Sequence, residues 1–399
     1  SPINRYYRGS LADPERWTPN WNRSFELKVD SPKAGVLMLH GLSDSPYSLR
    51  SLAERLHEAG AWVVGLRLPG HGTVPSGLVE VRWQDMAAAV RLAMRYLHQQ
   101  AGGQPLIIVG YSNGGALAVH YALDTLADAG LPAVSRLVLL SPEIGVSPAA
   151  AFAVWQARIG HLLGLEKLAW NAILPEYDPF KYGSFAVNAG DLAYRITSAM
   201  QTRLMAMANN NVLERFPPVL AFQSVVDATV SAPALVANLF ARLPENGHEL
   251  VLFDINRMAG MGLMLRNDPS PGIDRLIDHP GLTFAISLLT NANEHTRRVV
   301  VRLKHPGSIK LTEHPMELSW PVDVYSLSHV ALPFPPDDPL YGGEQAAVSP
   351  GIQLGSLALR GERGVLWVGA GDMLRMRWNP FYPYLEQRLL DFIGLSAGY

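Results

Sequence analysis

The sequence predicts an α/β fold in which a mostly parallel central sheet is flanked by helices. Between about residues 34 and 142, short apolar runs alternate with amphipathic helical patterns. The apolar runs are continuous rather than alternating, which is typical of parallel strands buried on both faces. A chain of 399 residues with 48% hydrophobic content can bury a large core. We therefore expect one large α/β domain that carries insertions.

The individual elements of this first part follow from hydrophobic periodicity. Apolar runs of strand length occupy residues 35–41, 61–68, 105–111 and 136–140. Helical spacing of apolar side chains lies between them, at residues 47–58, 83–98 and 115–129. Glycine and proline mark the turn at residues 69–72. The order of these elements predicts strands joined by crossover helices.

After Ser141-Pro142 the alternation stops. Residues 143–216 read as mainly helical and rich in Ala, Leu, Met and Trp, with a loop at residues 175–179. We interpret this segment as a helical cap inserted above the sheet. The alternative is a set of additional peripheral helices.

The remainder of the chain is expected to complete the core, at residues 217–399, after an N-terminal extension at residues 1–33. The strands and helices that the pattern predicts are 218–227 (strand), 232–243 (helix), 248–254, 322–327 and 364–368 (strands), and 380–395 (helix). Residues 255–321 are interpreted as a second insertion with strand-like pieces at 284–289 and 298–303. The core therefore comprises residues 34–142 and 217–399.

Composition argues against several function classes. The net charge is −2 and no basic block occurs, which disfavours nucleic acid and acidic membranes as partners. No run of 18 uncharged apolar residues predicts a transmembrane segment. Cysteine is absent, so thiol chemistry, disulfides and cysteine-ligated metals are excluded. The chain begins with Ser rather than Met, so we expect that an upstream segment was removed; this and the lack of cysteine favour export, while the location itself stays open.

The most informative motif is Gly110-Tyr111-Ser112-Asn113-Gly114. It stands between a strand-length apolar run and a helical pattern, which is the context of a G-x-S-x-G nucleophile elbow. A serine hydroxyl reacts only when it is held exposed beside a base, and a tight strand-to-helix turn does so. Glycine at both flanks avoids collisions with the neighbouring strand and helix. We predict Ser112 as a nucleophile; the alternative is an ordinary glycine-rich turn.

An activated serine needs a base and an orienting acid. Asp227 follows the first strand after the cap, at the sheet edge where Ser112 is expected, although it could instead cap the next helix. The strand at 248–254 would normally lead to the histidine, but no histidine follows it as far as residue 262. His329, after the strand-like run 322–327, is the best candidate. The histidines expected to be solvated surface residues are His279, His295, His305 and His314.

Backbone N–H groups are the expected oxyanion donors. Asn113 directly follows the nucleophile at a helix N-terminus, and Leu42 follows the glycine turn after the first strand. His40 and His71 also adjoin glycine turns, where we expect structural hydrogen bonds rather than chemistry.

The stretch Val36–Gly114 resembles the carboxylesterase and monoacylglycerol-lipase branch of the α/β-hydrolases, which is grouped with serine aminopeptidase-like hydrolases. The motifs that carry the resemblance are His40-Gly41, Pro46, the helix 51–60, Leu68-Pro-Gly-His-Gly72, Trp83-Gln-Asp85 and the turn 110–114. The resemblance implies the α/β-hydrolase fold, with Ser112 as nucleophile, Asp227 as acid and His329 as base. It also implies Leu42 and Asn113 as oxyanion donors, and no metal or organic cofactor. The acidic turn Pro336–Pro339 could bind calcium, but we interpret it as a solvated turn.

The expected activity is hydrolysis of a carboxylic ester with an apolar acyl group. Residues that could line an acyl cleft are Phe152, Trp155 and Trp170 in the cap, and Met258, Met261 and Met264 beyond it, although helix packing explains each one more simply. One alternative is amide or peptide hydrolysis on the same residues, with Glu143 holding a substrate ammonium. The other is a binding protein that keeps the fold without activity.

Overall fold

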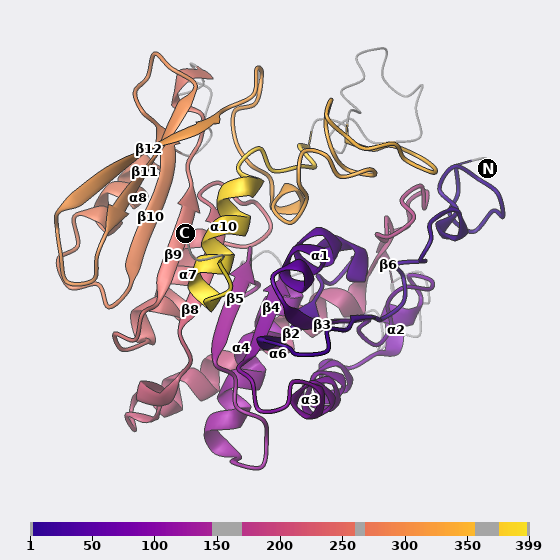
Figure 1. Cartoon of the computed structure of the whole chain (residues 1–399), viewed down its shortest axis with the longest axis horizontal. Helices are drawn as coiled ribbons and strands as arrows, with labels where there is room; N and C mark the ends of the chain where they lie inside the picture. The colour runs from indigo at the N-terminus through magenta and orange to yellow at the C-terminus, as the bar shows by residue number, and fades with distance from the viewer. Residues whose placement is uncertain (1–2, 146–169, 260–267, 356–374, 397–399) are drawn as a thin grey trace.

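A mixed β-sheet organises the molecule (Figure 1). The computed structural model describes residues 3–145, 170–259, 268–355 and 375–396. Within those ranges ten strands form one sheet in the order β1-β3-β2-β4-β5-β8-β9-β10-β11-β12. Their bounds are β1 Phe25–Leu27, β2 Ala34–Leu39, β3 Ala61–Leu66, β4 Leu106–Tyr111, β5 Arg136–Leu140, β8 Val219–Ser224, β9 Glu249–Phe253, β10 Ala285–Asn291, β11 Arg298–Lys304 and β12 Leu311–Ser319.

The strands from β3 to β10 in this order run parallel, and β1, β11 and β12 are antiparallel to their neighbours. Every residue of β2, β4 and β8 is buried. Burial on both faces is the reason that these segments are continuously apolar. The predicted parallel α/β fold is confirmed.

Helices cover both faces of the sheet. One face packs against α3 (Trp83–Gln100) and α4 (Asn113–Ala127), with α6 (Val187–Ala208) packed outside them, and the other face packs against α1 (Arg50–Glu58) and α10 (Tyr382–Ile393). Successive side chains of β2 enter opposite cores: Leu37 joins the first cluster and Val36 the second. Burying a side chain of this size contributes about 1.5–3 kcal/mol. The shorter helices are α2 (Gly77–Glu80), α7 (Ala232–Asn238) and α8 (Ser270–Ile277).

The described part of the expected cap combines strand, loop and helix. Strands β6 (Trp170–Ala172) and β7 (Phe185–Ala186) pair antiparallel, and α6 follows directly. The buried stripe of α6 includes Leu192, Ile196 and Met200, and it packs against the core that α3 and α4 share. The prediction that residues 143–216 are mainly helical is correct for α6, but it did not include the β6–β7 pair. Phe152 and Trp155 lie outside the described residues.

Residues 255–321 extend the central sheet rather than standing apart from it. β10 pairs parallel with β9, and β11 and β12 follow as antiparallel strands, at the left in Figure 1. The expected strand at 322–327 is wrong. Asp323 adopts φ 62°, which interrupts an extended backbone. Further along, Tyr325 O accepts from the N–H of Asn256 after β9, and Leu327 O accepts from Ser224 Oγ at the end of β8. The expected strand at 364–368 lies outside the described residues.

The N-terminal segment packs onto the core. Trp17 contacts Tyr47 and Phe180 edge-on, and the backbone of Arg5 donates to Glu176 O at 2.7 Å. These contacts tie the segment to the loop between β6 and β7. Edge-to-face aromatic pairs contribute about 0.5–1.5 kcal/mol each beyond burial.

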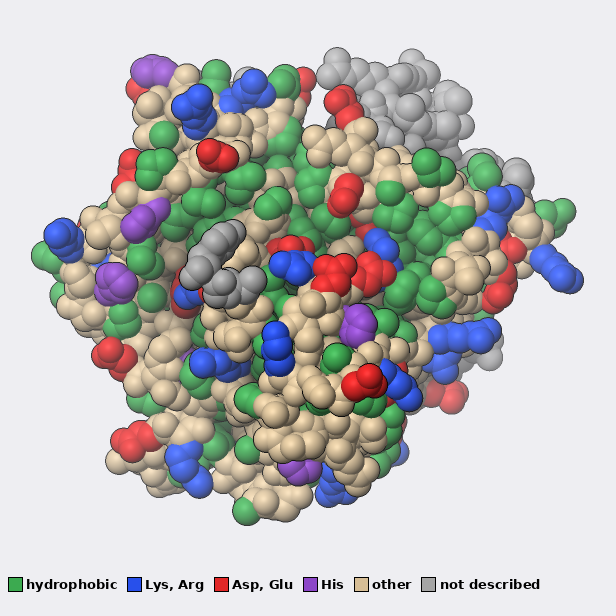
Figure 2. Space-filling view, in the orientation of Figure 1, with side chains coloured by type: hydrophobic (Ala, Val, Ile, Leu, Met, Phe, Trp, Pro, Cys, Tyr) green, Lys and Arg blue, Asp and Glu red, His purple; other side chains and the backbone are tan. Residues whose placement is uncertain are grey.

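The surface carries charges of both signs. On the face shown in Figure 2, basic and acidic side chains are interspersed. This pattern agrees with a net charge of −2. No helix in the described ranges has the length and apolar character needed to cross a bilayer.

Candidate active site

Ser112 occupies a strained turn between β4 and α4. Its φ of 54° and ψ of −117° lie outside the regions that most residues adopt, at a cost of about 1–3 kcal/mol. The turn is so tight that a Cβ on Gly114 would lie 2.0 Å from Leu39 O, and one on Gly110 would lie 2.5 Å from Gly114 O. The backbone N–H of Ser112 donates to Leu140 O at 2.9 Å. The two glycines of the motif therefore allow the nucleophile-elbow geometry.

His329 reaches Ser112 from a distant segment. It begins the short 3-10 helix His329–Ala331, and its Nε2 lies 3.1 Å from Ser112 Oγ. Tyr111 holds the same residue: its hydroxyl donates to His329 O at 3.3 Å, and the two rings lie 5.4 Å apart. Ser224 Oγ also donates to Leu327 O at 3.0 Å. The segment that returns from β12 is thus anchored at the carboxyl ends of β4 and β8.

Asp227 completes the hydrogen-bonded group. Its Oδ2 accepts from His329 Nδ1 at 2.8 Å, and its Oδ1 accepts from the N–H groups of Thr229 and Val230 at 2.8 and 3.0 Å. Burial disfavours the charged carboxylate, but the His329 and backbone donors outweigh it and lower the pKa of Asp227. Helix capping does not explain Asp227, since Ser231 caps α7 through Ala234 N.

These contacts set the tautomer of His329. An ionised carboxylate can only accept a hydrogen bond, so the hydrogen-bond network assigns the imidazole proton to His329 Nδ1. The lone pair of Nε2 then faces Ser112 Oγ. The arrangement can remove the hydroxyl proton from Ser112. The three predicted residues lie in contact; that they catalyse a reaction stays a prediction.

Two residues at this site were not predicted from the sequence. Gln223 is fully buried and donates to Asp227 Oδ2 at 3.0 Å. Tyr111 holds the backbone of His329. The detectable signal for Gln223 was a polar residue inside an otherwise apolar strand, since a buried amide needs hydrogen-bond partners.

The predicted oxyanion donors lie on both sides of Ser112. Asn113 is the first residue of α4, and the loop of Leu42 approaches so closely that a Cβ on Gly41 would lie 3.3 Å from Ser112 Cβ. Within the described chain, neither the Leu42 N–H nor the Asn113 N–H donates to a protein acceptor. Both groups are therefore available for a ligand oxygen.

The two histidines beside glycine turns hold this loop in place. His71 Nε2 lies 2.7 Å from Leu42 O, and His40 Nε2 accepts from Leu68 N at 3.1 Å. Burial lowers the pKa of both rings, which favours their neutral forms. Their contacts are with the backbone, as a structural role requires.

The backbone of Glu143 contacts that of the nucleophile. Its N–H group donates to Ser112 O at 3.0 Å, at the end of β5. Burial raises the pKa of Glu143 to about 8, because no described residue offers its side chain a hydrogen bond or ion pair.

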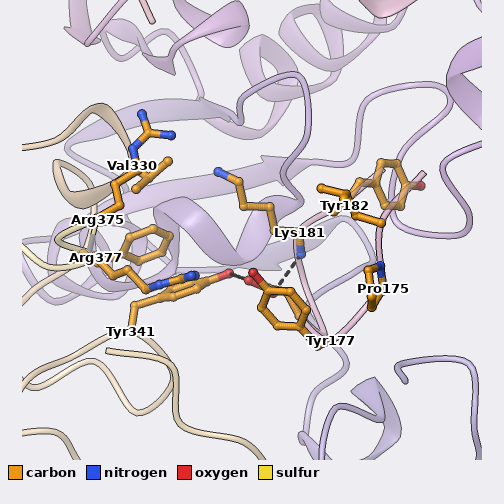
Figure 3. A pocket seen from close by; sticks show the side chains of 12 residues that line it. Pro175, Tyr177, Lys181, Tyr182, Val330, Tyr341, Arg375 and Arg377 are labelled. Carbon is orange, nitrogen blue, oxygen red and sulfur yellow. Dashed lines mark hydrogen bonds between the residues drawn. The ribbon is translucent and has the colours of Figure 1, made fainter. Parts of the chain in front are cut away.

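A cavity of about 190 Å³ adjoins the histidine loop (Figure 3). Its walls come from the loop between β6 and β7, from Val330 next to His329, and from the segment that contains Arg375 and Arg377. The side chains of Tyr177 and Tyr341 give it aromatic walls. Three cationic side chains, those of Lys181, Arg375 and Arg377, also line it.

Several other expected residues lie away from this group. Trp170 on β6 packs against the core, and Met258 is 45% exposed. Met261 and Met264 lie outside the described residues. The four histidines expected at the surface, His279, His295, His305 and His314, are exposed.

The acidic turn Pro336–Pro339 is only partly solvated, which corrects the expectation. Asp338 is buried and accepts from Tyr47 OH at 2.9 Å and from two backbone N–H groups. Its carboxylate thereby organises the turn that follows it. No group of potential metal ligands occurs among the described residues.

Comparison with known proteins gives the family. Residues 30–253, more than half of the chain, match the family described as serine aminopeptidase, S33. The chain belongs to this family. This match and the parallel sheet with its helices confirm the predicted α/β-hydrolase fold and family branch.

Relatives of this S33-family chain carry lipase names. A thermostable monoacylglycerol lipase from Bacillus sp. (strain H-257) is 36% identical over 94 residues, which is 24% of this chain and 37% of the relative. Lipase LipV from Mycobacterium tuberculosis (strain ATCC 25618 / H37Rv) is 29% identical over 244 residues, covering 57% and 88%. The chain thus spans little more than a third of the first relative. The solved monoacylglycerol lipase of Paleococcus ferrophilus has a TM-score of 0.43 at 20% identity, covering 58% of this chain and 89% of that one.

Proposed function

We propose that this protein is a serine hydrolase that cleaves carboxylic esters through an acyl-enzyme on Ser112. The observation that carries the proposal is the chain of contacts from Asp227 through His329 to Ser112, at 2.8 and 3.1 Å. Hydrogen-bond reach between nucleophile and base, with the base oriented by an acid, is the geometry that activates a serine. The lipase names of the relatives support an ester as the substrate.

The proposed reaction proceeds in two steps, formation and hydrolysis of an acyl-enzyme. Ser112 Oγ attacks the ester carbonyl carbon as its proton passes to His329 Nε2, and the Leu42 and Asn113 N–H groups donate to the resulting oxyanion. The carbon–oxygen bond to the alcohol then breaks, and His329 returns the proton to the leaving alcohol. Water repeats the sequence on the acyl-enzyme and releases the acid. Asp227 remains ionised and stabilises the imidazolium in both halves.

Peptide hydrolysis is the second candidate because Glu143, whose backbone contacts that of Ser112, could hold a substrate ammonium. An ammonium group of a substrate would need a charged carboxylate. Burial raises the pKa of Glu143 to about 8, which disfavours a charged carboxylate at neutral pH and supports the ester. The acyl part of the proposed substrate is a hydrocarbon chain.

Two measurements test the function. Rates with 4-nitrophenyl acyl esters from acetate to palmitate are compared with rates for aminoacyl 4-nitroanilides; we expect the esters to be preferred, and a strong preference for anilides would replace the ester proposal. A fluorophosphonate probe should label the wild type and not Ser112→Ala. Equal labelling of both would remove Ser112 as the nucleophile, and a complete lack of turnover and labelling would support a binding protein.

A further inference from the structure

The cavity beside the histidine loop carries an excess of positive charge. Its lining contains the cations Lys181, Arg375 and Arg377 and one carboxylate, that of Asp178. Figure 3 shows the Lys181 ammonium and the Arg375 guanidinium toward the same side of the view, with Arg377 near Tyr341. A concave site lined mainly by one sign of charge attracts ligands of the opposite sign.

The acidic groups near this cavity are already engaged. Asp178 accepts from Tyr341 OH at 2.6 Å and from the N–H groups of Phe180 and Lys181 at 2.9 and 3.0 Å. Asp44, behind the lining, lies 3.3 Å from Lys181 Nζ. Neither carboxylate contacts Arg375.

Arg375 hydrogen-bonds a neutral side chain. Its Nη2 donates to Thr229 Oγ1 at 3.1 Å, and it forms no ion pair with any described residue. The side chain is half-buried at the cavity wall. A guanidinium presents five donors and binds a carboxylate through two parallel hydrogen bonds, and Thr229 is the one acceptor that the described residues offer Arg375.

This cation lies close to the candidate triad. The backbone of its partner Thr229 donates to Asp227 Oδ1 at 2.8 Å, and Val330, which also lines the cavity, directly follows His329. The cavity therefore adjoins residues that neighbour His329 and Asp227 in the chain.

We propose that Arg375 binds a carboxylate carried by the ester substrate. The proposal rests on the proposed ester hydrolysis and specifies its substrate class: a half-ester whose free acid enters the cavity while aromatic and aliphatic walls contact the carbon chain. Arg375 acts in specificity and does not take part in proton transfer.

Two matched ester pairs test the proposal, and they distinguish an acid in the acyl part from an acid in the alcohol part. The first pair is mono-4-nitrophenyl adipate and its methyl ester, and the second is 3-(butanoyloxy)benzoate and its methyl ester. We expect wild-type kcat/KM to be about tenfold or more higher for the anionic member of one pair. The preference should shrink as NaCl is raised, because salt screens the attraction.

Variants assign the preference to Arg375. We expect Arg375→Gln to lower kcat/KM for the anionic ester about tenfold, mainly through KM, and to leave the neutral ester within about twofold. Arg375→Lys should restore part of the loss, since it keeps the charge without the two-pronged geometry. Arg95→Gln, which removes an exposed cation on α3, is the matched control and should change neither ester.

A binding measurement separates this proposal from the proposed function. Calorimetry on Ser112→Ala should show monomethyl adipate binding more tightly than dimethyl adipate, with the difference lost in Ser112→Ala/Arg375→Gln. The same calorimetry with propyl phosphate compares the binding of a phosphate with that of the carboxylate. Equal binding and equal kcat/KM for neutral and anionic esters would overturn the carboxylate site while leaving ester hydrolysis intact. Tighter binding of the phosphate would overturn the carboxylate as the ligand. Absence of all ester turnover would overturn the proposed function, and with it this proposal.

Discussion

The carboxylate of Asp227 accepts a 2.8 Å hydrogen bond from Nδ1 of His329, across 102 residues of sequence. β9, β10, β11 and β12 all lie between the two residues in the chain. The histidine returns over the sheet only after these strands. The strands β10, β11 and β12 can therefore be added to the sheet without separating His329 from Asp227.

Replacing Asp227 with Asn should lower kcat by about 10³–10⁴. The amide can donate to Nδ1, which would place the imidazole proton on Nε2 and remove the base that faces Ser112. Steady-state kinetics on a 4-nitrophenyl ester would measure the loss. Asp337→Asn, at an exposed position, is the control, and a D227N enzyme with near-normal kcat would show that the carboxylate does not orient the base.

Removal of the proposed nucleophile or base should reduce kcat by about 10⁴ or more without unfolding the protein. Ser112→Ala and His329→Ala should lose nearly the same activity, because the two groups act together. Near-normal turnover in His329→Ala would assign the base to another histidine. Thermal denaturation of each variant, followed by circular dichroism, checks that the fold is intact.

Gly114→Ala should destabilise the protein by about 1–3 kcal/mol or more. The added Cβ would lie 2.0 Å from Leu39 O, so β2 or α4 would have to move. Gly272→Ala in α8 is the matched control: nothing lies within 4 Å of its added Cβ, and alanine favours the helix by about 1 kcal/mol. Urea denaturation of the two variants should shift in opposite directions, and equal stability would contradict the tight elbow.

Glu143→Gln should stabilise the protein at neutral and alkaline pH. Burial raises the pKa of Glu143 to about 8, above its ordinary value of 4.5. Between these values the unfolded chain loses a proton that the folded chain keeps, so wild-type stability falls as pH rises through this window. The variant lacks this penalty. We expect no difference at pH 4 and a gain of up to about 5 kcal/mol at pH 9, because each pKa unit corresponds to about 1.4 kcal/mol. Urea denaturation measures it, and a pH-independent difference would exclude the titration.

Local pattern was enough to determine the parallel core and the elbow at Ser112. The apolar runs of β2, β4 and β8 are buried on both faces, and the glycines around Ser112 fit a turn that no larger residue allows. Both properties depend on backbone sterics and burial, which a short window of sequence encodes.

Tertiary packing decided the rest. Joining β10 to β9 depends on strand pairing between distant segments, so the sequence alone presented these strands as an insertion. The burial of Gln223 against Asp227, and the approach of Arg375 to Thr229, likewise require segments that are adjacent only after folding. Side-chain type suggested Ser112, Asp227 and His329 as partners, but only the folded sheet brings their atoms within hydrogen-bond distance, because that distance depends on the whole path of the chain between them.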